Sequence, residues 1–82
     1  MKTLEKISEL DLNYIADQLC NSMEFYESEK EFATWMNQET GLPKPFLAYL
    51  YNQFWELDVW FRCGIDTDWQ EWIIENLNKY EP

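Results

Sequence analysis

Residues 43–61 read PKPFLAYLYNQFWELDVWF, a run in which apolar side chains occupy most positions. Pro43 and Pro45 favour the start of a helix here, because proline is tolerated in a first helical turn. One stripe at helical spacing consists of Phe46, Leu47, Leu50, Phe54, Leu57 and Phe61. Tyr49, Tyr51, Trp55, Val59 and Trp60 occupy much of the remaining surface. A helix that is apolar nearly all round is normally central, so we expect a central helix that ends at Gly64.

Two helices are predicted before this segment. Ser8 is the expected N-cap of the first, whose apolar face comprises Leu12, Ile15, Ala16, Leu19, Cys20 and Met23. Ser28 and Glu31 match a capping box at the start of the second. Its apolar side comprises Phe32, Trp35 and Met36. This helix should stop at Thr40-Gly41, since glycine adopts the left-handed cap conformation without steric cost.

A last helix is predicted near the C-terminus, with its N-cap within residues 66–68. Its apolar side comprises Trp69, Trp72, Ile73, Leu77 and Tyr80. The chain of 82 residues therefore predicts a single all-α domain over residues 1–82, a compact bundle of about four short helices. The β-branched and aromatic content of residues 59–65 leaves a short β-strand there as an alternative.

The charge of the chain is strongly one-sided. Sixteen acidic residues stand against six basic ones and no histidine, giving a net charge of −10, beside five each of Trp, Tyr and Phe. Such aromatic content favours a packed core over disorder. A negative folded surface repels nucleic acid and anionic lipid and attracts basic partners. No stretch reaches the roughly 18 apolar residues of a membrane span, so we expect a cytoplasmic protein without membrane binding.

The residue inventory argues against catalysis. No histidine is present, and Cys20 and Cys63 form neither a CxxC pair nor part of a metal-ligand pattern, although a disulfide between them stays open. Asp66 and Asp68 begin like a calcium loop, but the glycine and closing glutamate of that loop are missing. We therefore predict no enzymatic activity, no cofactor and no metal.

The acidic residues form two groups along the chain. The first acidic cluster is Glu24, Glu27, Glu29 and Glu31; the second acidic cluster is Asp66, Asp68, Glu71 and Glu75. Acids in a first helical turn are stabilised by the helix dipole, which accounts for part of both clusters. Carboxylates three or four residues apart on a helix recur about every 4.5–6 Å. Duplex DNA presents a phosphate about every 3.4 Å on each strand. Both clusters, together with Tyr26 in the first junction, are therefore our candidate contacts for a basic, nucleic-acid-binding protein.

Part of the chain resembles a known family. The run Tyr26-x-Ser28-x-x-Glu31-Phe32-Ala33, the break at Gly41 and Pro43, and the helix containing Leu47-Ala48-Tyr49-Leu50 are similar to the C-terminal region of ArdA-type antirestriction proteins. The resemblance covers about 25 of the 82 residues. It implies an acidic helical protein that imitates bent DNA and occupies the DNA groove of type I restriction–modification enzymes. It assigns no individual binding residue.

Charge and resemblance together favour a small inhibitor, encoded by a phage or mobile element, that blocks the DNA-binding groove of a host defence enzyme. That enzyme would be a restriction–modification system or a CRISPR effector. Two alternatives stay open. One is an immunity or antitoxin module that neutralises a basic toxin. The other is a structural homodimer joined through Trp55 and Val59, whose acidity only keeps it in solution.

Overall fold

The computed structural model describes residues 7–58, 62 and 67–80, except for the side chains of residues 23 and 24. It consists of α1 (Glu9–Cys20), α2 (Ser22–Phe25), α3 (Glu29–Thr40), α4 (Lys44–Glu56) and α6 (Trp69–Lys79). No strand occurs within these ranges, so the prediction of an all-α bundle with about four main helices is confirmed. The alternative strand at 59–65 lies outside the described residues except for Arg62, which is helical.

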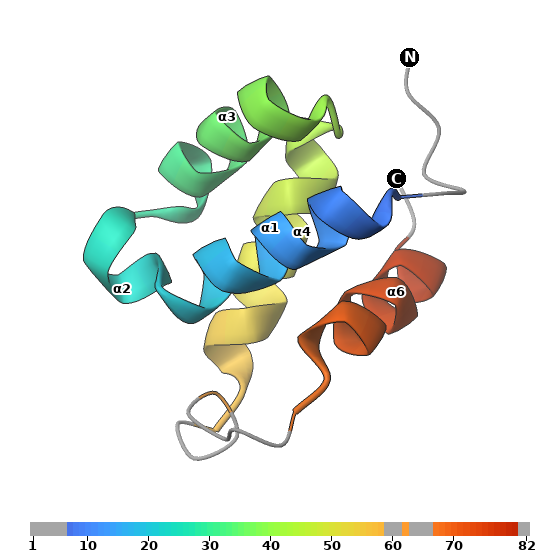
Figure 1. Cartoon of the computed structure of the whole chain (residues 1–82). Coiled ribbons are helices and arrows are strands. Elements are labelled where there is room, and N and C mark those ends of the chain that lie inside the picture. The colour runs from blue at the N-terminus through green and yellow to red at the C-terminus, as the bar shows by residue number, and fades with distance from the viewer. Residues whose placement is uncertain (1–6, 59–61, 63–66, 81–82) are drawn as a thin grey trace.

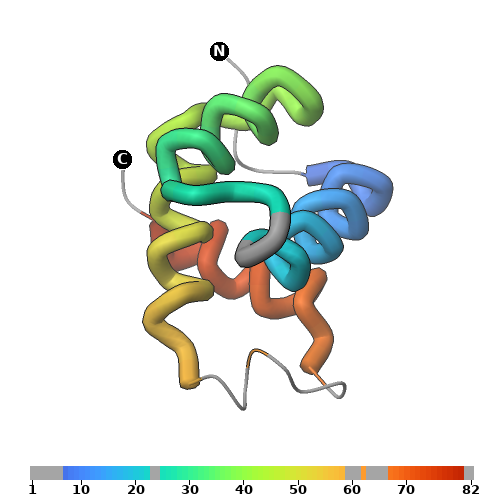
Figure 2. Tube along the Cα trace, turned by 90° about the vertical axis from the view of Figure 1, so that its left-hand side faces the viewer, coloured from blue at the N-terminus to red at the C-terminus, as the bar shows by residue number. Residues whose placement is uncertain are grey.

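The helices surround a small common core. In both views α3 lies at the top (Figures 1 and 2), and in Figure 1 α1 runs between α3 and α6. α3 packs against α4, and α6 packs against both α1 and α4. α4 therefore contacts helices on more than one side, which is why it is apolar on several faces. Each main helix contributes fully buried side chains to this core, among them Ile15, Leu19, Phe32, Met36, Phe46, Leu47, Leu50 and Ile73.

Aromatic side chains join α4 to α6. The ring of Phe54 lies 5.0 Å from that of Trp69 and 6.2 Å from that of Trp72, measured between centroids. At the C-cap of α6, the Tyr80 ring lies 5.3 Å from the Phe46 ring and 5.2 Å from the Tyr49 ring, between centroids. Such tilted and edge-on pairs each stabilise by about 0.5–1.5 kcal/mol beyond the area that they bury. The predicted apolar side of the last helix is thus confirmed as its core-facing side.

α4 ends earlier than predicted, at Glu56 and not at Gly64. The backbone at Leu57 is extended, and the Leu57 N–H turns back to the Phe54 carbonyl. The Arg62 guanidinium then donates to the carbonyl oxygens of Trp55 and Leu57, at 3.2 and 2.6 Å. A cation that satisfies the free carbonyls of a helix end also complements its negative dipole. A side chain outside the helix therefore provides the C-terminal cap.

Two residues predicted to face the core are exposed. Only Leu12, Ile15 and Leu19 of α1 are buried, whereas Cys20 is exposed because it lies about 100° further round the helix from Leu19. In α3 the buried face is centred on Phe32, Met36 and their neighbours, and Trp35 is 47% exposed. α1 also stops at Asn21, whose side-chain amide donates to the Asp17 carbonyl at 2.9 Å. The first predicted helix is thus divided into α1 and α2.

The predicted helix caps are present. The side chains of Ser8, Ser28 and Asp68 accept hydrogen bonds from the backbone N–H groups of Asp11, Glu31 and Glu71, at 3.1, 3.3 and 3.1 Å. Gly41 caps the C-terminus of α3 with φ = 76°, in the left-handed region. Beside it, the Thr40 hydroxyl accepts from the Leu42 N–H at 3.2 Å. Local chemistry therefore determines where α3 begins and ends.

Replacement of Gly41 by alanine should lower the free energy of unfolding by about 1 kcal/mol, because a β-carbon is disfavoured at positive φ. Gly41→Asn is the matched control and should lose less, since asparagine tolerates this conformation. Urea denaturation followed by circular dichroism measures both. Equal stability of the alanine variant and the native chain would contradict the cap assignment.

Candidate acidic interface

The first acidic cluster lies at the junction of α2 and α3. Glu27, Glu29 and Glu31 are all exposed, and the Glu24 side chain lies outside the described residues. Glu31 is on the side of α3 away from its buried face, about 100° from Phe32. The carboxylates of this cluster are therefore presented to solvent by the first turn of α3 and the loop before it.

The second acidic cluster lies on α6. Asp68, Glu71 and Glu75 are exposed, and Asp66 lies outside the described residues. Glu71 and Glu75 are on the side of α6 opposite the buried Ile73. They therefore point away from α1 and α4, against which α6 packs. Lys79 follows Glu75 at helical i,i+4 spacing and is also exposed.

The two clusters face different directions. α3 and α6 lie on opposite sides of α1 in Figure 1, and the acids of both clusters in the described residues are exposed. Within the described ranges, therefore, they are not joined into one continuous ridge. Exposed acids also occur elsewhere on the bundle, at Glu9, Asp17, Glu39, Glu56 and Asp58. Negative charge consequently surrounds the bundle, and a flat partner surface would meet one cluster at a time.

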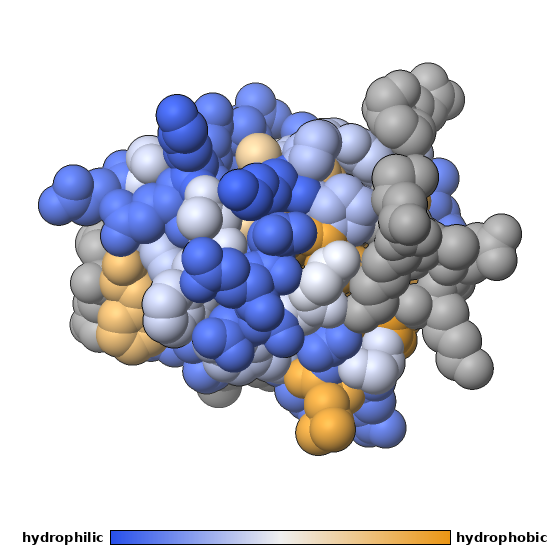
Figure 3. Space-filling model, turned by 90° about the horizontal axis from the view of Figure 1, so that it is seen from above, coloured by the Kyte–Doolittle hydropathy of each residue, from blue (hydrophilic) through white to orange (hydrophobic). Residues whose placement is uncertain are grey.

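Positive charge is sparse on the same surface. The basic residues in the described part of the chain are Lys30, Lys44, Arg62 and Lys79. Figure 3 views the molecule from above, where α3 lies, and shows mostly hydrophilic side chains with small apolar patches towards the edges. A basic partner approaching α3 from this side would therefore meet a hydrophilic surface, on which the exposed acids Glu29, Glu31 and Glu39 outnumber the one cation of α3, Lys30.

Tyr26 is a packing residue. It is buried, its ring meets Phe32 edge-on at 5.3 Å between centroids, and its hydroxyl donates to Gln18 Oε1 at 2.5 Å. Burial, and then the nearby Tyr14, Glu31 and Glu39, raises the pKa of Tyr26 to about 12. Tyr26 is one of the candidate contacts from the sequence, but its buried position fits packing better than contact with a partner.

Sequence reasoning missed an aromatic pocket between α1 and α3. This pocket, of about 410 Å³, is lined by Tyr14, Gln18, Phe25, Tyr26 and Trp35. Trp35 Nε1 donates to the Tyr14 hydroxyl at 3.2 Å, which ties the two helices together across its wall. One signal in the sequence could have indicated it. Trp35 lies four residues from both Glu31 and Glu39, so it belongs to an acidic stripe and not to the core stripe.

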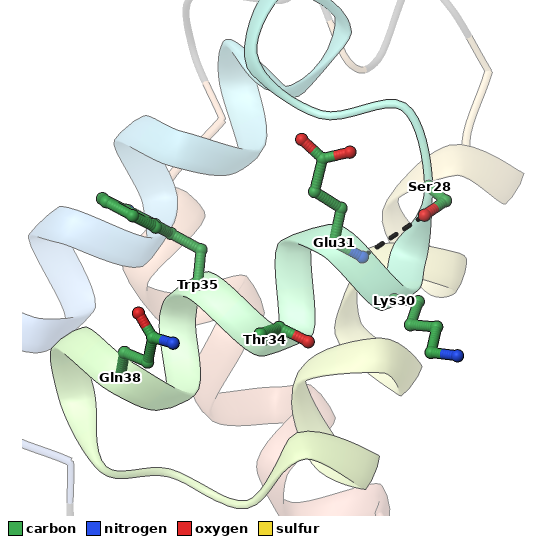
Figure 4. A pocket seen from close by; sticks show the side chains of 6 residues that line it. All are labelled: Ser28, Lys30, Glu31, Thr34, Trp35 and Gln38. Carbon is green, nitrogen blue, oxygen red and sulfur yellow. Dashed lines mark hydrogen bonds between the residues drawn. The ribbon is translucent and has the colours of Figure 1, made fainter.

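A second hollow, of about 400 Å³, follows the outer side of α3 (Figure 4). It is lined by Ser28, Lys30, Glu31, Thr34, Trp35 and Gln38. In Figure 4 Trp35 extends towards α1, whereas Lys30 extends to the opposite side of the helix. The cation of α3 therefore lies away from the aromatic pocket, and the pocket side of the helix keeps its negative character.

The predicted homodimer residues and the two cysteines belong to neither acidic cluster. Trp55 is half-buried, packs against Tyr51 and Phe54, and lies 4.7 Å beneath the Arg62 guanidinium. Val59, the second residue predicted for a homodimer interface, lies outside the described residues. Cys20 is a free thiol whose pKa is raised by partial burial and then by the Asp17 carboxylate. Cys63 is not among the described residues.

No family model, curated protein or solved structure matches this chain. Among the described residues, no group of three or more Cys, Asp or Glu side chains is placed to hold a metal ion. None of the helices that the structure describes is long and apolar enough to cross a bilayer.

The raised pKa of Tyr26 predicts a loss of stability at high pH. The folded state keeps the phenolic proton up to about pH 12, whereas the unfolded chain releases it near its ordinary pKa of 10.0. Unfolding is therefore favoured as the pH rises between these two values, and the stabilisation is fully present only below the lower one. The free energy of unfolding, from urea titrations at several pH values, should fall less steeply in Tyr26→Phe. Tyr51→Phe is a useful comparison, since burial also raises the pKa of Tyr51. An unchanged slope in Tyr26→Phe would contradict the assignment.

Proposed function

We propose that this protein is an inhibitor that imitates nucleic acid and occupies the DNA-binding groove of a host defence enzyme, a restriction–modification system or a CRISPR effector. The observation that carries the proposal is the outward display of carboxylates on helices, around a bundle with few cations. The net charge of −10 on 82 residues is larger than the magnitude of about 2–8 that keeps a small domain in solution. Stabilisation of helix N-termini by acidic residues does not by itself require such an excess of negative charge.

The dimensions of the bundle suit such a role. Its Cα atoms span 36 × 24 × 23 Å, and the long axis is close to the 34–36 Å of one duplex turn. Duplex DNA carries one charge per about 1.7 Å of axis, or roughly 20 per turn. The protein carries about half that number. It would therefore imitate part of a duplex, with the first acidic cluster as its main contact with the groove and the second cluster at the edge of the interface.

Inhibition in this proposal is occlusion without turnover. Basic side chains that normally bind phosphates would bind carboxylates, and anions held by the free groove would be released. The inhibitor and DNA would then exclude one another. Affinity should depend steeply on salt, as it does for DNA itself.

The direct test is DNA cleavage by a purified type I restriction enzyme and by a Cas9-type effector, each titrated with this protein. Inhibition of at least one enzyme is expected, with an apparent inhibition constant that rises with duplex concentration. Affinity should weaken by several orders of magnitude between about 50 and 200 mM salt, if six to ten charges engage. Inhibition that is insensitive to salt and to duplex would contradict mimicry and favour an immunity-type module. Activity of both enzymes at saturating protein would exclude these targets.

Neutral substitutions test whether inhibition depends on the positions of particular carboxylates or only on the total negative charge of the protein. The variants Glu29→Gln/Glu31→Gln and Glu71→Gln/Glu75→Gln each remove two charges, so both retain a net charge of −8, two less negative than the −10 of the native chain. We expect the α3 pair to weaken inhibition about tenfold and the α6 pair clearly less, because Glu31 shares the hollow along α3 with Trp35 and lies near Tyr26. Interfacial charges contribute far more than peripheral ones. Equal losses in the two variants would show that only total charge matters.

A further inference from the structure

Two large apolar side chains are exposed at one place on the bundle. Phe25 is 52% exposed and Trp35 is 47% exposed, and both line the aromatic pocket with Tyr14. Exposed aromatic rings beside a polar rim are typical of interaction sites. The other strongly exposed apolar side chains of the described residues, Leu10 and Ile74, line none of the pockets described above. The aromatic pocket therefore brings two of the four strongly exposed apolar side chains in the described part of the chain together in one hollow.

The walls of the pocket are held in place by hydrogen bonds. Trp35 Nε1 binds the Tyr14 hydroxyl, and the Tyr26 hydroxyl binds Gln18 Oε1. The Tyr26 ring in turn packs edge-on against Phe25 and the buried Phe32. These contacts join α1, α2 and α3, so the aromatic walls are presented in a preformed arrangement. A ligand would then bind with little ordering of these side chains.

Two carboxylates lie close to the pocket. Glu31 and Glu39 lie one helical turn on either side of Trp35, and both are exposed. Both carboxylates are near enough to contribute to the raised pKa of Tyr26. No hydrogen bond or ion pair occupies them among the described residues. Neither glutamate lines the pocket itself, but both carboxylates are available close to its aromatic faces. Together these groups fit a cation that has a flat, polarisable surface.

We propose that the aromatic pocket receives an arginine side chain of the partner protein. A guanidinium stacks on aromatic rings and donates several hydrogen bonds in one plane, to carboxylates or to an amide oxygen such as Gln18 Oε1. The same chain already holds a guanidinium this way, with Arg62 lying 4.7 Å from the Trp55 ring. The identity of the partner rests on the proposed function, where arginines that normally bind phosphate would be diverted. The arginine chemistry rests on the pocket alone.

Short capped peptides test the pocket without any partner protein. The full chain is titrated with acetyl-Gly-Arg-Gly-amide, its lysine counterpart and its citrulline counterpart, which is neutral but shaped like arginine. The readout is the NMR signal of the Trp35 indole N–H, assigned with Trp35→Phe. The arginine peptide should shift this signal with a Kd on the order of 1–10 mM, as fits one stacked ion pair. The lysine peptide should bind at least threefold more weakly, and the citrulline peptide should cause no shift.

Two variants and a control locate the binding. Trp35→Ala should weaken binding about tenfold, followed through the Tyr14 ring signals, and Glu31→Gln/Glu39→Gln should weaken it about fivefold while keeping the aromatic walls. Ile74→Ala, an exposed apolar residue of α6, should leave it unchanged. Equal shifts with citrulline, equal affinity for lysine, or an unaltered Kd in the glutamine variant would each overturn the proposal. Arginine binding without enzyme inhibition would refute only the proposed function, and inhibition without arginine binding only the pocket assignment.

Discussion

The structure depends on burying α4, a helix that carries apolar side chains on several faces. α4 buries Phe46, Leu47, Leu50 and Phe54 and partly buries Tyr49, Tyr51 and Trp55. Burial of apolar surface is the main favourable term in folding, at roughly 25 cal/mol for each Å². In a chain of 82 residues, the apolar sides of all three remaining main helices are needed to cover α4. α1, α3 and α6 must therefore each turn one face inward.

The outward direction of the carboxylates follows from that arrangement. An ionised carboxylate is strongly disfavoured in an apolar interior, so the polar faces of α1, α3 and α6 become the surface. Their mutual repulsion destabilises the folded state. Stabilising contributions come from acids placed in first helical turns, such as Glu29 and Glu71, and from the aromatic pairs of the core. A strongly acidic surface is thus compatible with a small bundle because the core is rich in aromatic side chains.

The same packing creates the feature on which recognition would depend. α3 is anchored by Phe32 and Met36, which leaves Trp35 at its edge, facing α1. The hydrogen bond from Trp35 to Tyr14 then places an indole beside a phenol at the surface, with Glu31 and Glu39 one turn away. In the proposed role, acidic clusters would attract a basic groove over long range and the aromatic pocket would provide a contact of defined shape. Charge alone attracts many basic proteins, whereas a fitted arginine would distinguish among them.

Local sequence determined most of the secondary structure, because caps and helical periodicity act within a few residues. Ser8, Ser28 and Gly41 could be assigned in advance for that reason, and the N-cap of α6 could be placed within residues 66–68. The core positions of α4 and α6 could also be assigned. The end of α4 could not, since its last carbonyls are capped by Arg62 from outside the helix. Nor could the exposure of Trp35 or the burial of Tyr26, because an amphipathic pattern does not say how wide a face the neighbouring helices will cover. The sequence determined how many carboxylates the protein carries. Only the packing of α3 and α6 on different sides of the bundle decided that they form two separate surfaces, since the core must be closed from both sides.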